Sequence, residues 1–174
     1  MAIAYVNSTN NSATNTSSIT LNKPSGVSTG DLMIGVITAS NTTNNVFFSV
    51  PTGWTSLADN SLTGSNVNTH AVVCYRFVQA GDPTSWTTTG DRQAAWVSIT
   101  SVYSGVDSTT PFVDQNNNQV NNTTPTVNNT ASGAWRVASW QGGHATLGMS
   151  WSGYSPSDTE RQDLDINGSS SSSN

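Results

Sequence analysis

Turn residues interrupt this chain so often that its apolar residues occur only in short runs. Gly, Pro, Asn and Ser separate these runs, and inside them apolar residues alternate with polar ones or stand side by side. The spacing of three and four residues that predicts an amphipathic helix is nearly absent. Short strands joined by frequent turns are typical of sandwiches and barrels rather than of βαβ units. The sequence therefore predicts an all-β fold, an antiparallel β-sandwich of jelly-roll type with long polar loops.

Eleven strands are expected from this pattern. They cover residues 3–7, 18–22, 31–39, 46–49, 55–59, 69–78, 85–89, 94–103, 133–141, 146–151 and 160–166. Because residues 31–39 and 94–103 are almost continuously apolar, we expect them to be central strands, with 69–78 as a third. The polar residues 8–17 are expected to form a loop, and the Asn-rich residues 114–130 a long exposed connection of a kind that often makes functional contacts.

The length of 174 residues suits one domain with a sizeable core. Residues 1–17 are expected to form an N-terminal strand and a polar connection, and residues 18–166 the β-sandwich domain. Residues 167–174 form a Ser-rich tail or the start of a loop.

The surface is expected to be polar but nearly uncharged. Only 9% of the residues are charged, against about 25% in typical proteins. Five basic and ten acidic residues give a net charge of 5 − 10 = −5, and the basic residues are scattered. No basic stripe is present to bind a phosphate backbone or an anionic membrane surface, so we expect no nucleic-acid partner and no membrane partner. Neither a signal-peptide pattern nor an apolar stretch of about 18 residues occurs, so we expect synthesis in a cytoplasm without export.

No catalytic motif accompanies this pattern, and we expect neither enzymatic activity nor a cofactor. His70 and His144 are the two histidines, and Cys74 is the single cysteine. A zinc site needs three or four ligands, so no metal site is expected. Gly-x-Ser-x-Gly, which marks a hydrolase nucleophile, is absent. Cys74 lies in an apolar strand pattern and is expected to be a small core residue; the alternative, a nucleophile, requires a histidine partner.

The acidic residues are dispersed along the chain and do not follow calcium-loop spacing. Asp31 follows a glycine and is expected to cap a turn by accepting backbone N–H bonds; the alternative is a metal ligand. Asp107 and Asp114 flank Pro111 and are expected to shape the turn that ends a strand. The alternative is a glycosidase pair, which needs two carboxyl groups facing each other across a cleft.

Six of the fourteen Trp, Tyr and Phe residues are tryptophans. Trp96 is expected in the core because it lies in an apolar strand. Trp54 follows Pro51-Thr-Gly and is expected to form a lid over the sandwich edge. Four aromatic residues late in the chain are candidates for ligand binding through exposed rings that stack on sugars: Trp135, Trp140, Trp151 and Tyr154. The alternative is that these rings fill the core.

Four short sequence motifs, here called phrases, follow one another along the chain, and each is a turn joined to an apolar strand. They are Lys23-Pro-x-Gly-Val-x-x-Gly-Asp-Leu, Pro51-x-Gly-Trp, Tyr75-Arg-Phe-Val leading to Asp82-Pro, and Tyr103-Ser-Gly-Val-Asp. In this order, over residues 19–165, they resemble a β-sandwich domain family of tailed-phage virion proteins, which includes minor tail, head-fibre and head-decoration proteins. The resemblance transfers no catalytic residue. It implies that a loop and closing strands follow the stretch Asp158-Thr-Glu-Arg-Gln-Asp, so we expect either a fragment of a longer product or a partner strand supplied by a neighbouring molecule, since an open edge would be an aggregation hazard.

The resemblance implies a structural protein of a bacteriophage virion, made in the host cytoplasm. The first expectation is a head decoration (cement) or head-fibre protein on the outer surface of the capsid. Its partners would be the major capsid protein or other virion proteins, with homo-oligomers also implied. The alternative is a tail or fibre receptor-binding module that recognises host surface glycans through its tryptophans.

Overall fold

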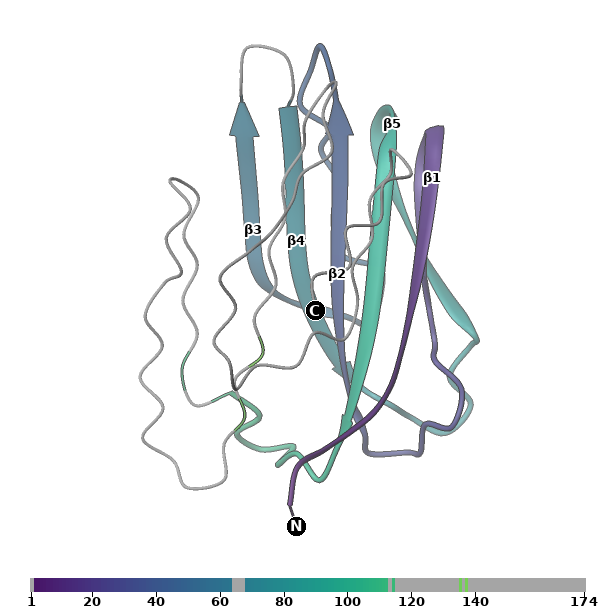
Figure 1. Cartoon of the computed structure of the whole chain (residues 1–174), viewed down its shortest axis with the longest axis vertical. Coiled ribbons are helices and arrows are strands. Elements are labelled where there is room, and N and C mark those ends of the chain that lie inside the picture. The colour runs from purple at the N-terminus through teal and green to yellow at the C-terminus, as the bar shows by residue number, and fades with distance from the viewer. Residues whose placement is uncertain (1, 64–67, 113, 115–134, 136, 138–174) are drawn as a thin grey trace, which may run out of the picture.

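In the part of the chain that the structure describes, five antiparallel strands form one sheet (Figure 1). The computed structural model describes residues 2–63, 68–112, 114, 135 and 137. Its strands are β1 (Ala4–Asn22), β2 (Leu32–Asn41), β3 (Thr55–Thr63), β4 (Asn68–Phe77) and β5 (Ser85–Ser104). They lie in the order β1-β5-β2-β4-β3, and no helix occurs in these ranges. The all-β prediction is confirmed for this part of the chain.

The three strands predicted to be central lie next to one another in the middle of the sheet. β2 pairs with β4 on one side and with β5 on the other, so that Leu32 lies between Phe77 and Tyr103. Seven of the first eight residues of β2 are buried. Continuous apolar sequence therefore predicted these positions correctly, because a strand covered on both faces has no solvent side on which polar residues could alternate.

The predicted loop over residues 8–17 is wrong. These residues belong to β1, which pairs with β5 from Ala4↔Ser104 to Asn22↔Ser85. Thr and Ser are compatible with a half-exposed strand, so their polarity marks exposure here rather than a loop. The strand is interrupted by register shifts on either side of Thr16, and Asn15 adopts a positive φ of 55°. The predicted strands 85–89 and 94–103 are likewise joined in β5.

β1 and β5 fold over together at this interruption. Figure 1 shows both ribbons turning at the upper end of the view and running back across the sheet. The returning part of β1 crosses β5, because Ser98 Oγ donates a hydrogen bond to the Thr20 carbonyl at 2.6 Å. Farther along, a Cβ atom on Gly35 would lie 3.0 Å from Leu21 Cδ1. The returning segments, which we call the outer limbs (residues 18–22 and 85–89), therefore cover one face of the sheet.

The main core lies between the sheet and the outer limbs. Its buried members are Ile19, Leu21, Met33, Ile37, Ala39, Val46, Phe48, Trp54, Val72, Cys74, Val78, Trp86, Ala94, Trp96 and Val102. Trp96 is fully buried, as predicted, and its indole N–H donates to the Thr16 carbonyl at 2.8 Å. Trp54 was expected to form a lid over an edge; it is 6% exposed and belongs to this cluster.

The opposite face of the sheet is also apolar. Leu32, Ile34 and Tyr103 are buried there, with Tyr75 and Phe112 among the partly buried residues packed against them. Tyr75 and Phe112 meet edge to face, with ring centroids 4.9 Å apart. β2 thus contributes apolar side chains to both faces, which agrees with its place at the centre of the sheet.

Two further predictions concern shorter segments. The predicted strand 55–59 is confirmed and extends to Thr63 in β3. The predicted strand 46–49 is wrong, because only one isolated bridge forms there, between Phe48 and Gly90. The predicted strands 146–151 and 160–166 lie outside the described residues, as do nearly all of 133–141 and of the Asn-rich connection.

Candidate functional site

The sequence phrases beginning at Lys23, Pro51 and Tyr75 meet at one end of the sheet, around the side chain of Arg76. Its Nη2 donates to Asp82 Oδ1 at 2.6 Å, and its Nη1 donates to the Gly53 carbonyl at 3.3 Å. The guanidinium carbon lies 4.9 Å from the ring centroid of Trp86. The side chains of Arg76 and Asp82 are only 11% and 6% exposed. We call Arg76, Asp82, Gly53 and Trp86 the arginine clamp.

Neighbouring turns are tied to the arginine clamp. Lys23 Nζ donates to the Asp82 carbonyl at 3.0 Å, and the Gln79 N–H donates to Asp82 Oδ2 at 2.8 Å. Trp54 meets Trp86 edge to face, with centroids 5.4 Å apart. Gly53 has a positive φ of 84°, and a Cβ there would lie 2.7 Å from Arg76 Nη1. The clamp therefore joins three chain segments through Nη1 and Nη2 of Arg76, while the buried Nε of the same side chain has no hydrogen-bond partner.

Asp31 caps a turn, as predicted. Its Oδ2 accepts the Ser28 N–H at 2.8 Å, and its backbone is paired with Val78 in the continuation of the β2–β4 ladder. Asp107 also shapes a turn, because its carboxylate accepts bonds from the Thr109 N–H, the Thr109 hydroxyl and the Thr110 hydroxyl. These bonds, those from Thr109 above all, lower the pKa of the Asp107 carboxyl. The turn interpretation is confirmed at both positions, and an acid-donating role is disfavoured at Asp107 because such an acid needs a raised pKa.

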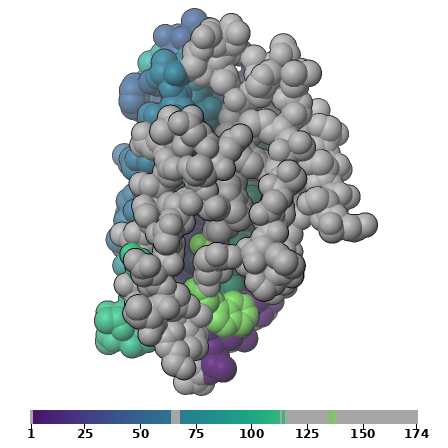
Figure 2. Space-filling view, turned by 60° about the vertical axis from the view of Figure 1, so that its left-hand side comes forward, coloured from purple at the N-terminus to yellow at the C-terminus, as the bar shows by residue number. Residues whose placement is uncertain are grey.

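Of the four aromatic residues predicted to bind a ligand, Trp135 is the one that the structure describes. Its side chain is 48% exposed, and its ring meets Tyr103 edge to face with centroids 6.3 Å apart. Tyr103 meets Tyr5 in the same manner at 5.9 Å. Figure 2 shows the N-terminal residues and the residues that follow β5 at the same end of the molecule. The other three candidates, Trp140, Trp151 and Tyr154, lie outside the described residues.

A second cluster, which the sequence pattern did not indicate, surrounds His70 on β4. His70 is 4% exposed; its Nδ1 lies 2.8 Å from the Val46 carbonyl and its Nε2 2.6 Å from Asp59 Oδ1. Since a carbonyl only accepts, Nδ1 carries a proton. Phe48 packs against the imidazole with centroids 4.4 Å apart. His70 therefore ties β3 and β4 to the segment before β3.

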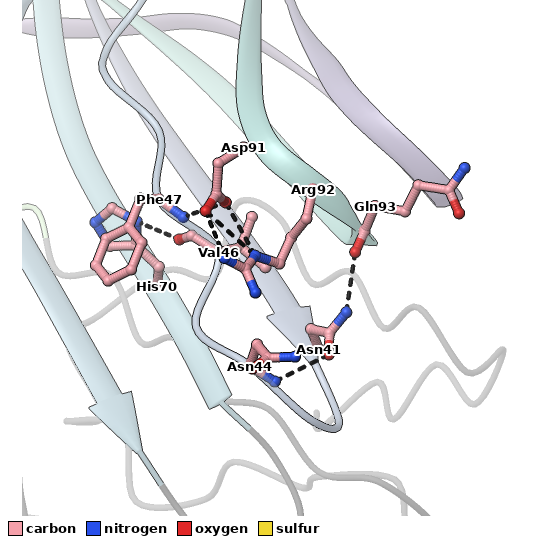
Figure 3. Close-up of polar contacts among 8 residues, drawn as sticks. All are labelled: Asn41, Asn44, Val46, Phe47, His70, Asp91, Arg92 and Gln93. Carbon is pink, nitrogen blue, oxygen red and sulfur yellow. Dashed lines mark hydrogen bonds and ion pairs between the residues drawn. The ribbon is translucent and has the colours of Figure 1, made fainter.

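The same segment is held from the other side by Asp91 (Figure 3). The Phe47 N–H donates to Asp91 Oδ1 at 3.0 Å, and the Asp91 N–H donates to the Phe47 carbonyl at 3.1 Å. Arg92 Nη2 pairs with the same carboxylate at 2.7 Å. The bond to Arg92 and the bond from Phe47 lower the pKa of Asp91. Side-chain bonds thus take up backbone groups of residues 46 and 47, which explains why the predicted strand 46–49 does not form a ladder.

An open groove lies beside this segment. It has a volume of about 430 Å³ and is lined by Phe47, Phe48, Ser49, Val50, Pro51, Thr52, Thr87, Thr88 and Thr89. Its walls are the segment before β3 and the outer limb of β5. No sequence signal pointed to it, because its two walls are separated by more than thirty positions and meet only when β5 folds over.

Cys74 is fully buried in the core, as predicted, and burial raises the pKa of its thiol to about 12. Among the residues that the structure describes, no three His, Cys, Asp or Glu side chains form a group that could hold a metal ion. Within the same ranges, no helix is long and apolar enough to cross a membrane. Comparison with protein-family models, with curated proteins and with solved structures gave no match.

Proposed function

We propose that the chain is a structural protein of a bacteriophage virion, a head decoration (cement) or head-fibre protein on the outer surface of the capsid. The observation that carries the proposal is the arginine clamp. Residues from three of the four phrases on which the family resemblance rests are bound to one another there, with Arg76 and Asp82 almost entirely buried. In this chain the residues of these phrases hold turns together, which supports a role in building rather than in catalysis.

The proposal includes the jelly-roll sandwich. β2 has apolar residues on both faces, and the outer limbs account for the cover of only one. A sheet with two apolar faces needs a layer on each. A second layer over Leu32, Ile34 and Tyr103 would complete the sandwich.

The surface chemistry is consistent with a place in a crowded assembly. The sequence carries few charges, and exposed strand positions hold Thr, Ser and Asn, as along β1. Neutral polar surfaces of this kind can pack against the major capsid protein or other virion proteins without burying unpaired charges.

One observation favours a second candidate, a tail or fibre module that binds host glycans. Trp135 is half exposed and braced by Tyr103. A supported, accessible indole is well suited to stacking on a sugar ring. Under this second candidate function, the protein would belong to the tail of the virion rather than to its head.

The experiment that tests both candidates is quantitative mass spectrometry of purified virions of the phage that encodes the chain. The copy number is measured relative to the major capsid protein. A simple-fraction ratio supports decoration of the head. A few copies per particle support the tail module, and absence from the particles overturns both.

A further inference from the structure

The open groove between the segment before β3 and the outer limb of β5 is large enough for a small ligand. Its volume of about 430 Å³ lies in the range of roughly 300–1,000 Å³ that is usual for small-molecule sites. None of its lining residues belongs to the cluster of Tyr5, Tyr103 and Trp135.

The lining is rich in hydroxyl groups and carries no charge. Ser49, Thr52, Thr87, Thr88 and Thr89 supply hydroxyls, and the remaining lining residues are apolar. Thr88 is buried and its hydroxyl donates to the Ser49 carbonyl. Thr52, Thr87 and Thr89 are exposed, and their hydroxyls form no hydrogen bond in the part of the chain that the structure describes. They are available to donate to and accept from a neutral polar ligand.

Phe47 supplies an exposed aromatic ring at this groove. Its side chain is 57% exposed, the largest value among the exposed large hydrophobic residues of the described ranges. An exposed aromatic ring is accessible for stacking on a ligand. The ring is also not on a loose loop, because the backbone of Phe47 exchanges two hydrogen bonds with Asp91.

The residues on either side of Phe47 fix it further. The Val46 carbonyl is held by His70 at 2.8 Å, as Figure 3 shows. Phe48 is buried between His70 and Trp96, with centroid distances of 4.4 and 4.9 Å. An aromatic ring held outward on an anchored backbone loses little conformational entropy on binding, which is how preorganised sites gain affinity.

We propose that this groove binds a neutral saccharide. The ring of Phe47 stacks on the apolar face of a sugar, and the hydroxyls of Thr52, Thr87 and Thr89 hydrogen-bond its hydroxyl groups. The lining offers no cation for an acidic sugar or a phosphate, and the net charge of −5 disfavours anions. The proposal goes beyond the virion role and does not depend on it.

The test is affinity electrophoresis of the full chain in gels containing one purified polysaccharide each. The neutral probes are soluble starch, laminarin, yeast mannan and a galactan; polygalacturonate is the acidic probe. At least one neutral probe is expected to retard the protein, and the acidic probe is not. Retardation by no neutral probe, or by polygalacturonate alone, overturns the proposal.

Variants then locate the binding site. Phe47→Ala is expected to weaken binding by about tenfold or more, because it removes the stacking ring. Thr87→Val with Thr89→Val keeps the β-branched shape and removes two hydroxyls, and it is also expected to weaken binding. Leu62→Ala, at another exposed apolar residue, serves as the control and is expected to bind as the parent does. Trp135→Ala is measured beside it and reports on the predicted aromatic site.

Far-UV circular dichroism and a thermal melt accompany each variant. Should Phe47→Ala fail to fold, Phe47→Leu replaces it, since Leu keeps apolar contact with the segment but lacks a flat ring. Unchanged binding by a folded Phe47 variant overturns the proposal. So does a loss of binding that follows Trp135→Ala instead, a result that would move saccharide binding to the predicted aromatic site and leave the virion role untouched.

Discussion

Arg76 lies over the ring of Trp86, with the guanidinium carbon 4.9 Å from the ring centroid, and the same guanidinium pairs with Asp82 at 2.6 Å. Arg76 comes from the end of β4, and Trp86 from the start of β5. The turn between these strands is therefore closed by one side chain that is both stacked and ion-paired. Arginine suits this place better than lysine because its planar group can stack and donate several hydrogen bonds together.

Replacing Arg76 by Leu is expected to destabilise the protein strongly. The substitution leaves the carboxylate of Asp82, which is 6% exposed, without its charged partner. Breaking a buried pair in this way costs about 3 kcal/mol or more. Urea unfolding measures the change. Arg92→Ala is the matched control, because Arg92 pairs with Asp91 on the surface, and its midpoint is expected to stay close to that of the parent. Equal losses for both variants would contradict a special role for the clamp.

Thr100 offers a stabilising substitution. Its side chain is 1% exposed, and its hydroxyl has no hydrogen-bond partner. Thr100→Val keeps the shape and removes the buried polar atom, so a gain of about 1 kcal/mol in unfolding free energy is expected. Thr88→Val is the control, because the Thr88 hydroxyl donates to the Ser49 carbonyl, and this variant is expected to lose stability. Thermal melts of the pair check the opposite signs; a destabilised Thr100→Val would mean that the hydroxyl is satisfied by bound water.

Continuous apolar sequence allowed the centre of this sheet to be predicted. The runs that contain Ile34, Cys74 and Ile99 became the adjacent strands β2, β4 and β5. Because these strands are buried on both faces, polar and apolar residues do not alternate along them. The continuous apolar sequence is therefore enough to predict that they are central strands. The turn role of Asp31 was predictable for a similar reason, because a Gly-Asp pair before an apolar run has a local hydrogen-bonding explanation.

The edge of the sheet was not predictable from polarity. Residues such as Ser8 and Asn10 in β1 look like a loop by composition, yet they pair with β5. Their strand state depends on a partner more than eighty positions away, and the fold-over near Asn15 on partners more than seventy positions away. The groove depends on that same fold-over, and the His70 cluster joins β3 and β4 to residues 46–48, which no local pattern connects to them.

Cys74 is expected to resist thiol reagents while the protein is folded. Burial raises the pKa of its thiol from 9.0 to about 12, so almost no thiolate forms at pH 8, and no reagent reaches the side chain. Labelling with a chromogenic disulfide is expected only when denaturant unfolds the chain. Fast labelling of the native protein would show that the core around Cys74 opens.

The same shift predicts an alkaline loss of stability. The folded state holds the Cys74 proton more tightly than the unfolded state does, so the contribution of this proton is intact below pH 9. As pH rises from about 9 toward 12, the unfolded thiol ionises first and the unfolding free energy falls. Cys74→Ala is expected to lack this contribution to the pH dependence of stability. The urea midpoint of the parent should therefore fall more between pH 8 and pH 10 than the midpoint of Cys74→Ala does.

His70 is expected to stabilise the segment that carries Phe47. His70→Leu fills a similar volume but leaves the Val46 carbonyl without its donor, which costs about 2 kcal/mol. Asp59→Asn retains an oxygen at the other end of the ring, and because Asp59 is 61% exposed it is expected to cost much less. Urea unfolding gives both values, and hydrogen exchange at the Phe47 amide reports the local effect. If His70→Leu left this amide as protected as in the parent, Asp91 alone would hold the segment, since it accepts the Phe47 N–H directly.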